Sequence, residues 1–335
     1  MFPVGALLQL KTCCYAFVGS VLHIVALLKC DSILGLIVFL NVNLLCYTHQ
    51  QYNRIPAEFP QVPVILAESK DKKPFINHPV LEHYGECVYI HLFALTDTET
   101  FESLPQILQY CSTVLRISGR ALKAYRNNDE VKYHINANEG EFSDCNVVTI
   151  GVGHDVKVEQ RLKLENDYCR FVAADPIEAV NRDIFNPIGE FFPYAIGHEN
   201  KVEPANVKLD PNSDAYTLVN FTHIELVTFL RDHAKIRPTL IDNFLLDAEG
   251  AEYGLIPYFT IGGALDKAGI TICQANVEFH QPDKDKRKQF ADFIRGMLTE
   301  RRYLPLKGEV GVHMRLFLLN VANDTCVRKY VTNKL

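Results

Sequence analysis

From Asn146 onward, short apolar runs alternate with stretches in which apolar residues recur at helical spacing. Buried strands of a parallel sheet read as continuous apolar runs, and amphipathic stretches between them supply the crossover helices. The pattern predicts strands over 147–150, 169–174, 191–196, 240–246, 270–279 and 312–320. It predicts helices over 156–165, 177–185, 224–233 and 285–301, with helical turns from 247 to about 267. This alternation predicts an α/β domain over residues 146–325, with a doubly wound, mostly parallel sheet.

The first fifty residues follow a different pattern, in which charges almost disappear. Residues 13–28 and 32–47 carry no formal charge, and Lys29 and Asp31 separate them. Each run would form a helix about 24 Å long, slightly shorter than a hydrocarbon core of about 30 Å. We therefore expect residues 1–50 to be a membrane or targeting segment, as one transmembrane helix or as a hairpin of two short helices. A cleaved signal peptide and a buried soluble helix are the alternatives.

The side of the membrane on which the rest of the chain lies stays open. Lys11, Lys29 and Arg54 are spread over all the flanks, so the positive-inside rule does not choose an orientation. Sequons at Asn220 and Asn323 permit N-glycosylation if the body of the protein is luminal. We expect a membrane location in the endoplasmic reticulum or Golgi, with the N-terminal segment as the membrane contact.

Between this segment and the α/β domain the pattern changes twice. Residues 51–79 are more polar and rich in proline, which predicts an extended linker. Residues 80–145 have apolar positions at helical spacing over 101–125, which predicts a preceding helical subdomain. With 335 residues, 48% of them apolar, the chain is long enough for these parts and for a sizeable core.

Charge and cysteine content narrow the possible partners. The net charge of −6, without a basic stretch interleaved with aromatics, argues against nucleic acid. No two of the 10 cysteines have C-x-x-C spacing, so the sequence indicates no zinc site, and nothing in it requires another metal. The cysteines beyond the apolar leader either form disulfides, as in an oxidising compartment, or are ordinary buried thiols. They are Cys87, Cys111, Cys145, Cys169, Cys273 and Cys326.

The first two strands of the α/β domain end in glycines and a carboxylate. Gly151 and Gly153 follow the first strand, where they either form an ordinary turn or let the backbone approach a ligand closely. Asp175 follows the second strand, and its carboxylate could bind ribose hydroxyls or cap the helix that begins at Pro176. Ligands of open parallel sheets bind beyond the carboxyl ends of the strands, so these residues together predict a nucleoside pocket.

Titratable residues crowd the ends of two later strands. Asp247, Glu249 and Glu252 are either favourable acids in the first turn of a helix, or a general base and ligands for a substrate hydroxyl. Glu278 and His280 lie two residues apart, so strand alternation puts both side chains on one face. His280 is a candidate base or metal ligand, with a structural histidine as the alternative.

These strand ends resemble those of a known family. Residues 247–252, with the sequence D-A-E-G-A-E, resemble the D-V-E-G-A-E block of the FkbM-type methyltransferases. Residues 277–280 resemble the V-E-x-H strand of that family, and 174–176 and 195–197 fall where it has its second and third strand ends. The resemblance covers about residues 145–320, and the overall pattern is similar to nematode members that carry an apolar N-terminus.

The resemblance implies a class I methyltransferase fold, Rossmann-like, that uses S-adenosylmethionine as cofactor. It implies O-methylation of a hydroxyl on a sugar, glycan or small metabolite. Carried over by position, the residues that line the methionine end would be Gly151 and Gly153, with Asp175 at the ribose and Ile196 at the adenine. The candidate catalytic residues at the methyl-transfer end are Asp247, Glu249 and His280. The first strand departs from the D-V-G-A-N sequence of many members, because Thr149 stands in place of the acid.

Two other functions compete with a methyltransferase. The departure at Thr149 would suit a non-catalytic, membrane-tethered binding protein that keeps the fold. A nicotinamide oxidoreductase would share the glycine turn and the downstream acid, but the third glycine of its pattern is replaced by Val156. Its Tyr-x-x-x-Lys pair has a counterpart in Tyr303 and Lys307, yet Pro305 between them opposes a helix that presents both.

Overall fold

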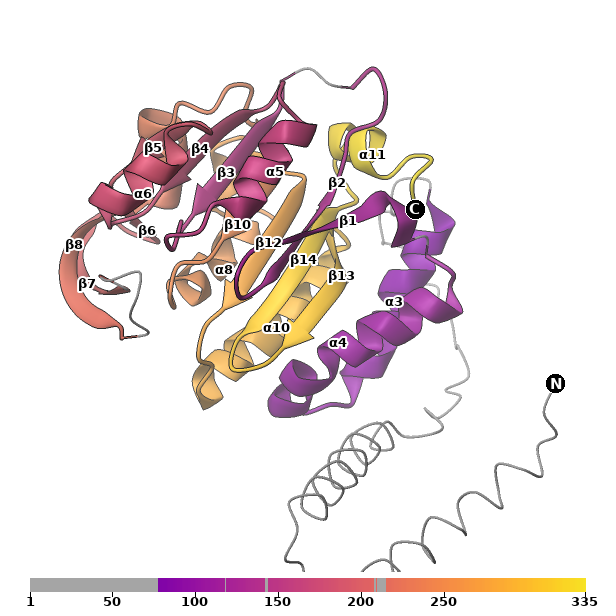
Figure 1. The fold of residues 1–335 in the computed structure, drawn as a ribbon. Coiled ribbons are helices and arrows are strands. Elements are labelled where there is room, and N and C mark those ends of the chain that lie inside the picture. Colours follow the sequence, from indigo (N-terminus) through magenta and orange to yellow (C-terminus); the bar gives the residue numbers. More distant parts are fainter. Residues whose placement is uncertain (1–77, 118, 142–143, 208, 210–214) are drawn as a thin grey trace, which may run out of the picture. The chain divides into compact units, whose positions relative to one another are not determined.

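The computed structural model describes residues 78–335 except 118, 142–143, 208 and 210–214, and these belong to one compact unit (Figure 1). The expected membrane or targeting segment, residues 1–50, lies outside the described residues, as does nearly all of the expected linker 51–79. Among the helices that are described, none is long and apolar enough to cross a membrane.

A seven-stranded mixed sheet forms the centre of this unit (Figure 1). In spatial order its strands are β13 (Tyr303–Val310), β14 (Met314–Asn320), β12 (Gln274–Phe279), β10 (Asn243–Leu246), β3 (Asn146–Ile150), β4 (Arg170–Ala174) and β5 (Glu190–Phe192). From β12 to β5 all neighbours are parallel, whereas β14 is antiparallel to both of its neighbours. The predicted α/β architecture with a mostly parallel sheet is therefore confirmed.

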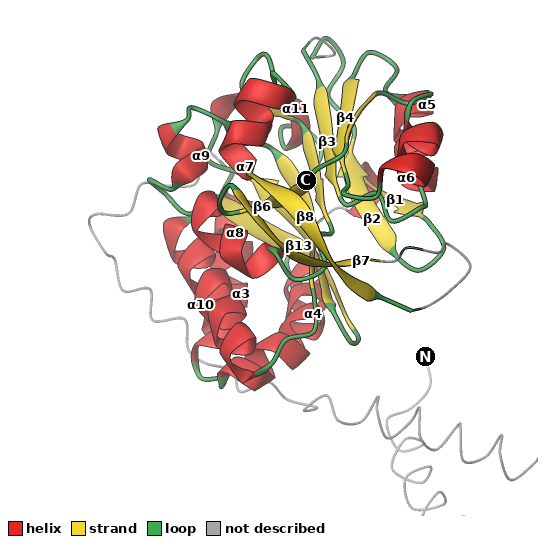
Figure 2. Cartoon of the chain, turned by 90° about the vertical axis from the view of Figure 1, so that its left-hand side faces the viewer, coloured by secondary structure: helices red, strands yellow, loops and turns green. Residues whose placement is uncertain are grey.

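Helices cover both faces of the sheet because successive side chains of each strand point to opposite sides. Val147 of β3 packs in a core with α5 and α6, whereas Val148 belongs to the larger core shared with α3, α4, α8 and α10. Figure 2 shows the two groups of helices on opposite sides of the strands. The helices are α3 (Pro79–Phe93), α4 (Asp97–Val114), α5 (Lys157–Glu165), α6 (Glu178–Phe185), α8 (Glu252–Phe259), α9 (Ala264–Lys267), α10 (Lys284–Glu300) and α11 (Asp324–Tyr330).

The region 80–145, expected to be a helical subdomain, holds two helices and a β-hairpin. Helical structure was expected over 101–125, but helix α4 ends at Val114. After a short 3₁₀ turn, β1 (Leu122–Arg126) pairs with β2 (Val131–Ile135). The hairpin joins the main sheet through side chains of β12: Tyr133 N donates to Asn276 Oδ1 and Ile135 N to Gln274 Oε1, both at 2.7 Å. Helices and hairpin thus share one core with the α/β region.

Several predicted elements are divided or replaced in the structure. The predicted strand 191–196 is split, because β5 joins the main sheet while β6 (Ala195–Gly197) pairs with β8 (Thr217–Glu225) and β7 (Lys201–Val207) in a small second sheet. The predicted helix 224–233 is reduced to α7 (Leu226–Thr228) and one π-helical turn, Phe229–His233. Two-residue strands β9 (Leu240–Ile241) and β11 (Thr271–Ile272) precede β10 and β12.

Strand β13 was not predicted, because Pro305 and Gly308 weaken the strand signal of its sequence. The structure accommodates Pro305 next to an irregularity in the pairing with β14, between Pro305 and Lys307. Tyr303 and Lys307 therefore lie on a strand, and the buried hydroxyl of Tyr303 donates to the carbonyl of Ile272 at 3.1 Å. This arrangement excludes them as a Tyr-x-x-x-Lys pair on a helix.

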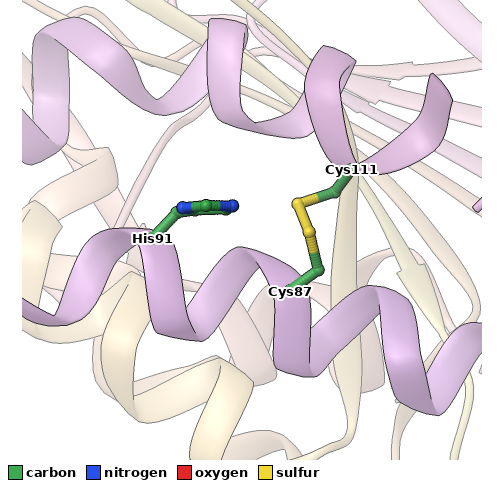
Figure 3. Close-up of side chains that lie close together, drawn as sticks. All are labelled: Cys87, His91 and Cys111. Carbon is green, nitrogen blue, oxygen red and sulfur yellow. A yellow bond between two sulfur atoms is a disulfide. The ribbon is translucent and has the colours of Figure 1, made fainter. Parts of the chain in front are cut away.

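All of the cysteines from Cys87 onward are paired in disulfides. The bonds are Cys87–Cys111, Cys145–Cys169 and Cys273–Cys326. Figure 3 shows the first of them between α3 and α4, with the ring of His91 beside it. Of the two alternatives that the sequence left open, the structure has disulfides.

The side chain of Asp242, between β9 and β10, is fully buried and joins the C-terminal helix to the sheet. It accepts hydrogen bonds from Lys329 Nζ and Tyr330 OH, both at 2.5 Å, and from Asn146 N at 2.8 Å. A buried carboxylate is tolerated only when donors of this kind replace its hydration.

Replacing Lys329 with Met should lower the free energy of unfolding by about 3–5 kcal/mol, because the Asp242 carboxylate loses its only cationic hydrogen-bond partner recorded among the described residues. Urea denaturation measures this change. The matched control is Arg328→Met, since Arg328 pairs with Glu141 at the surface and its loss should cost less than about 1 kcal/mol. Equal effects of the two substitutions would contradict the assigned role of Lys329.

Candidate active site

The order of the strands places a crevice at the carboxyl ends of β3 and β10. The chain winds from β3 to β4 and β5 on one side and returns to β10 and β12 on the other, so the connections diverge between β3 and β10. Open α/β sheets bind ligands at such a switch point. A cavity lies there, and it is lined by the predicted cofactor-binding and catalytic residues: Gly151, Gly153, Asp175, Ile196, Asp247, Glu249 and His280.

The turn after β3 passes very close to the turn after β10. Gly151 has a φ of +84°, and a Cβ atom built on it would lie 1.7 Å from the carbonyl oxygen of Asp247. Its amide donates to the carbonyl of Ala174, at the end of β4, at 2.9 Å. The glycine is thus required by both backbone conformation and space, and it holds three strand ends together.

Asp175 organises the glycine turn and also binds the residue before the next helix. Its Oδ2 accepts hydrogen bonds from the amides of Val152 at 2.8 Å and Gly153 at 3.2 Å, and its Oδ1 accepts from Ile177 N at 2.8 Å. The expected capping role is not confirmed, because α6 begins at Glu178 and its N-cap residue, Ile177, makes no side-chain cap hydrogen bond. The carboxylate of Asp175 instead fixes the turn that lines the cavity. A carboxylate has about four lone-pair sites, so Asp175 keeps acceptor capacity toward the cavity.

Glu252 is the residue that positions the acidic turn after β10. It is only 1% exposed, and its carboxylate accepts hydrogen bonds from Ala248 N at 2.7 Å, Gly250 N at 2.9 Å and His280 Nδ1 at 3.0 Å. The spacing of the acids gave no means to separate Glu252 from Asp247 and Glu249. The structure separates them, because Glu252 points into the protein while the other two line the cavity.

His280 links the three carboxylates. With its Nδ1 hydrogen held by Glu252, its Nε2 faces Asp247 Oδ1 at 3.4 Å and Glu249 Oε2 at 3.6 Å. Burial opposes the charged imidazole, but the hydrogen bond and the charge of Glu252, with the charges of Asp247 and Glu249, raise the pKa of His280 to about 10. At neutral pH His280 is therefore a cation and a donor, which does not suit a general base.

The two carboxylates that face the cavity have raised pKa values, whereas a typical ion pair lowers the pKa of its carboxylate. Burial raises the pKa of Asp247, Lys132 opposes this rise, and Glu278 adds to it. Burial likewise raises the pKa of Glu249, with His280 opposing the rise. Glu249 has a φ of +52°, which is uncommon for a residue with a side chain and is often found at functional sites.

The sequence did not identify the charged residues that β2, α5 and β14 add to the cavity. Glu130, just before β2, and Lys132 of β2 form a buried ion pair, and Glu278 pairs with Arg315 of β14 at 2.9 Å. Glu159 of α5 is also buried. Glu130, Lys132 and Arg315 are distant from the strand-end motifs in the sequence, and Glu159 is reached only through the fold of α5, so the pairing of strands and the packing of α5 bring these residues to the cavity.

Some described side chains are spaced as metal ligands would be. One group is Glu278, His280 and His313, and another is Cys87, His91 and Cys111, each with ligand atoms within 4.8 Å of one another. The two sulfur atoms of the second group form a disulfide and are not thiolate ligands (Figure 3). In the first group Glu278 is already paired with Arg315 and His280 with Glu252.

Comparison with known families gives one match. Residues 116–305, just over half of the chain, match the model of the Methyltransferase FkbM domain. No match is found among curated proteins. The matched region contains β1 to β12 and begins before the α/β part that the sequence resemblance covered.

Replacing Gly151 with Ala should lower the unfolding temperature more than Gly262→Ala does. Both glycines have positive φ, so each substitution adds backbone strain of roughly 1–2 kcal/mol. Only at Gly151 would the new Cβ meet backbone atoms, since nothing lies within 4 Å of the corresponding position at Gly262. Thermal unfolding of the two variants tests this difference, and equal losses would contradict the close approach to Asp247.

The imidazole of His280 should titrate near pH 10, which NMR of the ring protons measures. Because its pKa is raised from 6.5 by folding, its ion pairs stabilise the fold fully below about pH 6.5, and this contribution disappears as the pH rises through about 10. Glu252→Gln should lower the pKa more than Glu249→Gln, since Glu252 makes the hydrogen bond. A pKa near 6.5 in the unmodified protein would refute the arrangement.

Proposed function

The chain belongs to the FkbM methyltransferase family, and from this we propose that it transfers a methyl group from S-adenosylmethionine to a hydroxyl of a sugar or small metabolite. The observation that carries the proposal is the single cavity at the switch point. It joins a glycine turn and a strand-end acid on one side to a cluster of carboxylates and His280 on the other.

The first half of the cavity suits the cofactor. Asp175 at the end of β4 has acceptor capacity for ribose hydroxyls, and the buried side chain of Ile196 on β6 offers an apolar surface for adenine. The turn of Gly151 and Gly153 leaves room for the methionine end. The bound cofactor supplies a methyl group on a positively charged sulfur, and a wall rich in carboxylates is favourable for that charge.

The second half of the cavity suits a hydroxyl-bearing acceptor. Asp247 and Glu249 present oxygens that can accept hydrogen bonds from hydroxyl groups. We assign Asp247 as the base that takes the hydroxyl proton when the C–O bond forms and the C–S bond breaks. Its raised pKa lies closer to the working pH than that of an ordinary carboxylate, which suits a general base. His280, a cation held by Glu252, positions Asp247 and Glu249 and prevents their mutual repulsion. Most of the rate enhancement would come from orientation of the two reactants.

The departure at Thr149 makes a non-catalytic relative the second candidate function. Against it, the acidic cluster keeps an arrangement that a pure binding protein would not need. Glu249 stays in a strained backbone conformation, and Asp247 keeps a buried carboxylate that faces the cavity.

We further propose that the protein acts in the endoplasmic reticulum or Golgi, held at the membrane by residues 1–50. The three disulfides of the described residues support an oxidising compartment. The partner is then a glycan or small-molecule acceptor rather than nucleic acid, consistent with the net charge of −6.

Calorimetric titration of residues 50–335 with S-adenosylmethionine should show binding at one site, and Asp175→Ala should abolish it. Because Asp175 also holds the glycine turn, circular dichroism must show that the variant is folded. A folded unmodified protein that does not bind the cofactor would overturn the proposal and favour the non-catalytic function.

Asp247→Asn should bind the cofactor with unchanged affinity but lose about 10²-fold or more in turnover, because the amide cannot accept the hydroxyl proton. Methyl transfer to a panel of sugars and metabolites measures this loss. Arg315→Lys serves as a control that keeps the charge beside Glu278. Full turnover of Asp247→Asn would remove Asp247 from the mechanism.

A further inference from the structure

Thr149, which replaces the acid of many family members, has a carboxylate as its hydrogen-bond partner. Its hydroxyl donates to Glu159 Oε1 at 3.0 Å. Glu159 lies in the first turn of α5, the helix that follows the glycine turn, and is 3% exposed. The structure thus brings a buried carboxylate to the end of β3, although the sequence of the strand lacks one.

Glu159 lines the same cavity as Gly151 and Gly153. Its position in the first turn of a helix is favourable for a negative charge, because free amides and the positive end of the helix dipole are nearby. A glutamate with only a surface role would be neither buried nor hydrogen-bonded to the hydroxyl of Thr149. The location therefore indicates that the carboxylate of Glu159 is positioned to bind a ligand at the proposed methionine end of the cavity.

The charges around Glu159 leave room for a cation. Lys132 interacts with Glu130, Asp247 and Glu159. Arg315 also pairs with Glu130 and His280 with Asp247, whereas Lys132 is the cation that interacts with Glu159. Burial raises the pKa of Glu159, and Lys132 offsets only part of this rise. Buried negative charge without full compensation is unfavourable, and a ligand that brings a positive charge relieves it.

We propose that Glu159 binds the α-ammonium group of the methionine moiety of S-adenosylmethionine, in place of a strand-end acid at position 149. This inference rests on the proposed function. The hydroxyl of Thr149 takes one of the lone-pair sites of the Glu159 carboxylate, which keeps acceptor capacity for a charge-assisted hydrogen bond from the ligand. The departure at Thr149 is then a relocation of the carboxylate from β3 to α5 and not a loss of cofactor binding.

A pair of ligands that differ in the amino-acid moiety tests this assignment. S-adenosylhomocysteine carries the α-ammonium group, whereas 5′-methylthioadenosine has the same nucleoside and sulfur without it. Glu159→Gln should weaken S-adenosylmethionine and S-adenosylhomocysteine by about 10- to 100-fold, the value of one charged hydrogen bond, and leave 5′-methylthioadenosine unchanged. Calorimetry measures all three affinities.

Two variants complete the experiment. Glu165→Gln is the matched control, because Glu165 lies on the same helix but pairs with Lys123 and Tyr125 outside the cavity, and it should change none of the affinities. Thr149→Asp combined with Glu159→Thr restores the acid to β3 and should recover most of the affinity for S-adenosylhomocysteine. This second variant also tests the assignment if Glu159→Gln is poorly folded.

The possible outcomes distinguish failure of this inference from failure of the proposed methyltransferase function. If the unmodified protein binds S-adenosylmethionine and Glu159→Gln binds it equally well, the ammonium site is wrong and the function stands. If Glu159→Gln weakens 5′-methylthioadenosine as much as the other ligands, Glu159 has only a structural role. If the unmodified protein binds none of the ligands, both proposals fail.

Discussion

The carboxylate of Glu252 is the constraint on which the rest of the site depends. It is removed from water, and two backbone amides and the ring of His280 replace its hydration. The amides belong to the turn after β10 and the histidine to the end of β12. One buried carboxylate therefore fixes the distance and orientation of two strand ends. The geometry can vary little, because losing one of these hydrogen bonds would leave a buried polar group unsatisfied, which costs free energy of folding.

The opposite wall of the cavity is fixed by close packing and hydrogen bonds rather than by buried charge pairs. Gly151 allows the turn after β3 to touch the backbone of Asp247, and Asp175 ties that turn to the end of β4. The two walls meet at the contact between Gly151 and Asp247. The proposed cofactor side and the proposed acceptor side are in this way parts of one continuous edge, as the orientation of two reactants toward each other requires.

Electrostatics gives the cavity its selectivity in our account. Carboxylates next to β2 and β10, on α5 and on β12 outnumber the cations Lys132 and Arg315 beside them. The carboxylates of Glu252, Asp247 and Glu249 keep His280 charged. Under the proposed function, a cationic cofactor would be favoured on entry, and its uncharged-sulfur product would be less favoured after transfer. Burial, with a smaller contribution from neighbouring carboxylates, explains why Asp247 and Glu249 have raised pKa values although both lie near positive charges.

The sequence by itself determined the alternation of strands and helices, the mostly parallel sheet and the strand ends that meet at one cavity, because burial and turn chemistry are written locally in apolar runs, glycines and acids. It did not predict β13, where Pro305 and Gly308 weaken the strand signal, the hairpin of β1 and β2, which side chains of β12 hold, or the pairing of β6 with β8, which are separated in the chain. Tertiary structure alone decided which acid is buried and which faces the cavity. In the sequence nothing separates Glu252 from Asp247 and Glu249. Glu159 reaches the cavity only because α5 packs on β3. The physical reason is that the environment of a side chain is set by the whole fold.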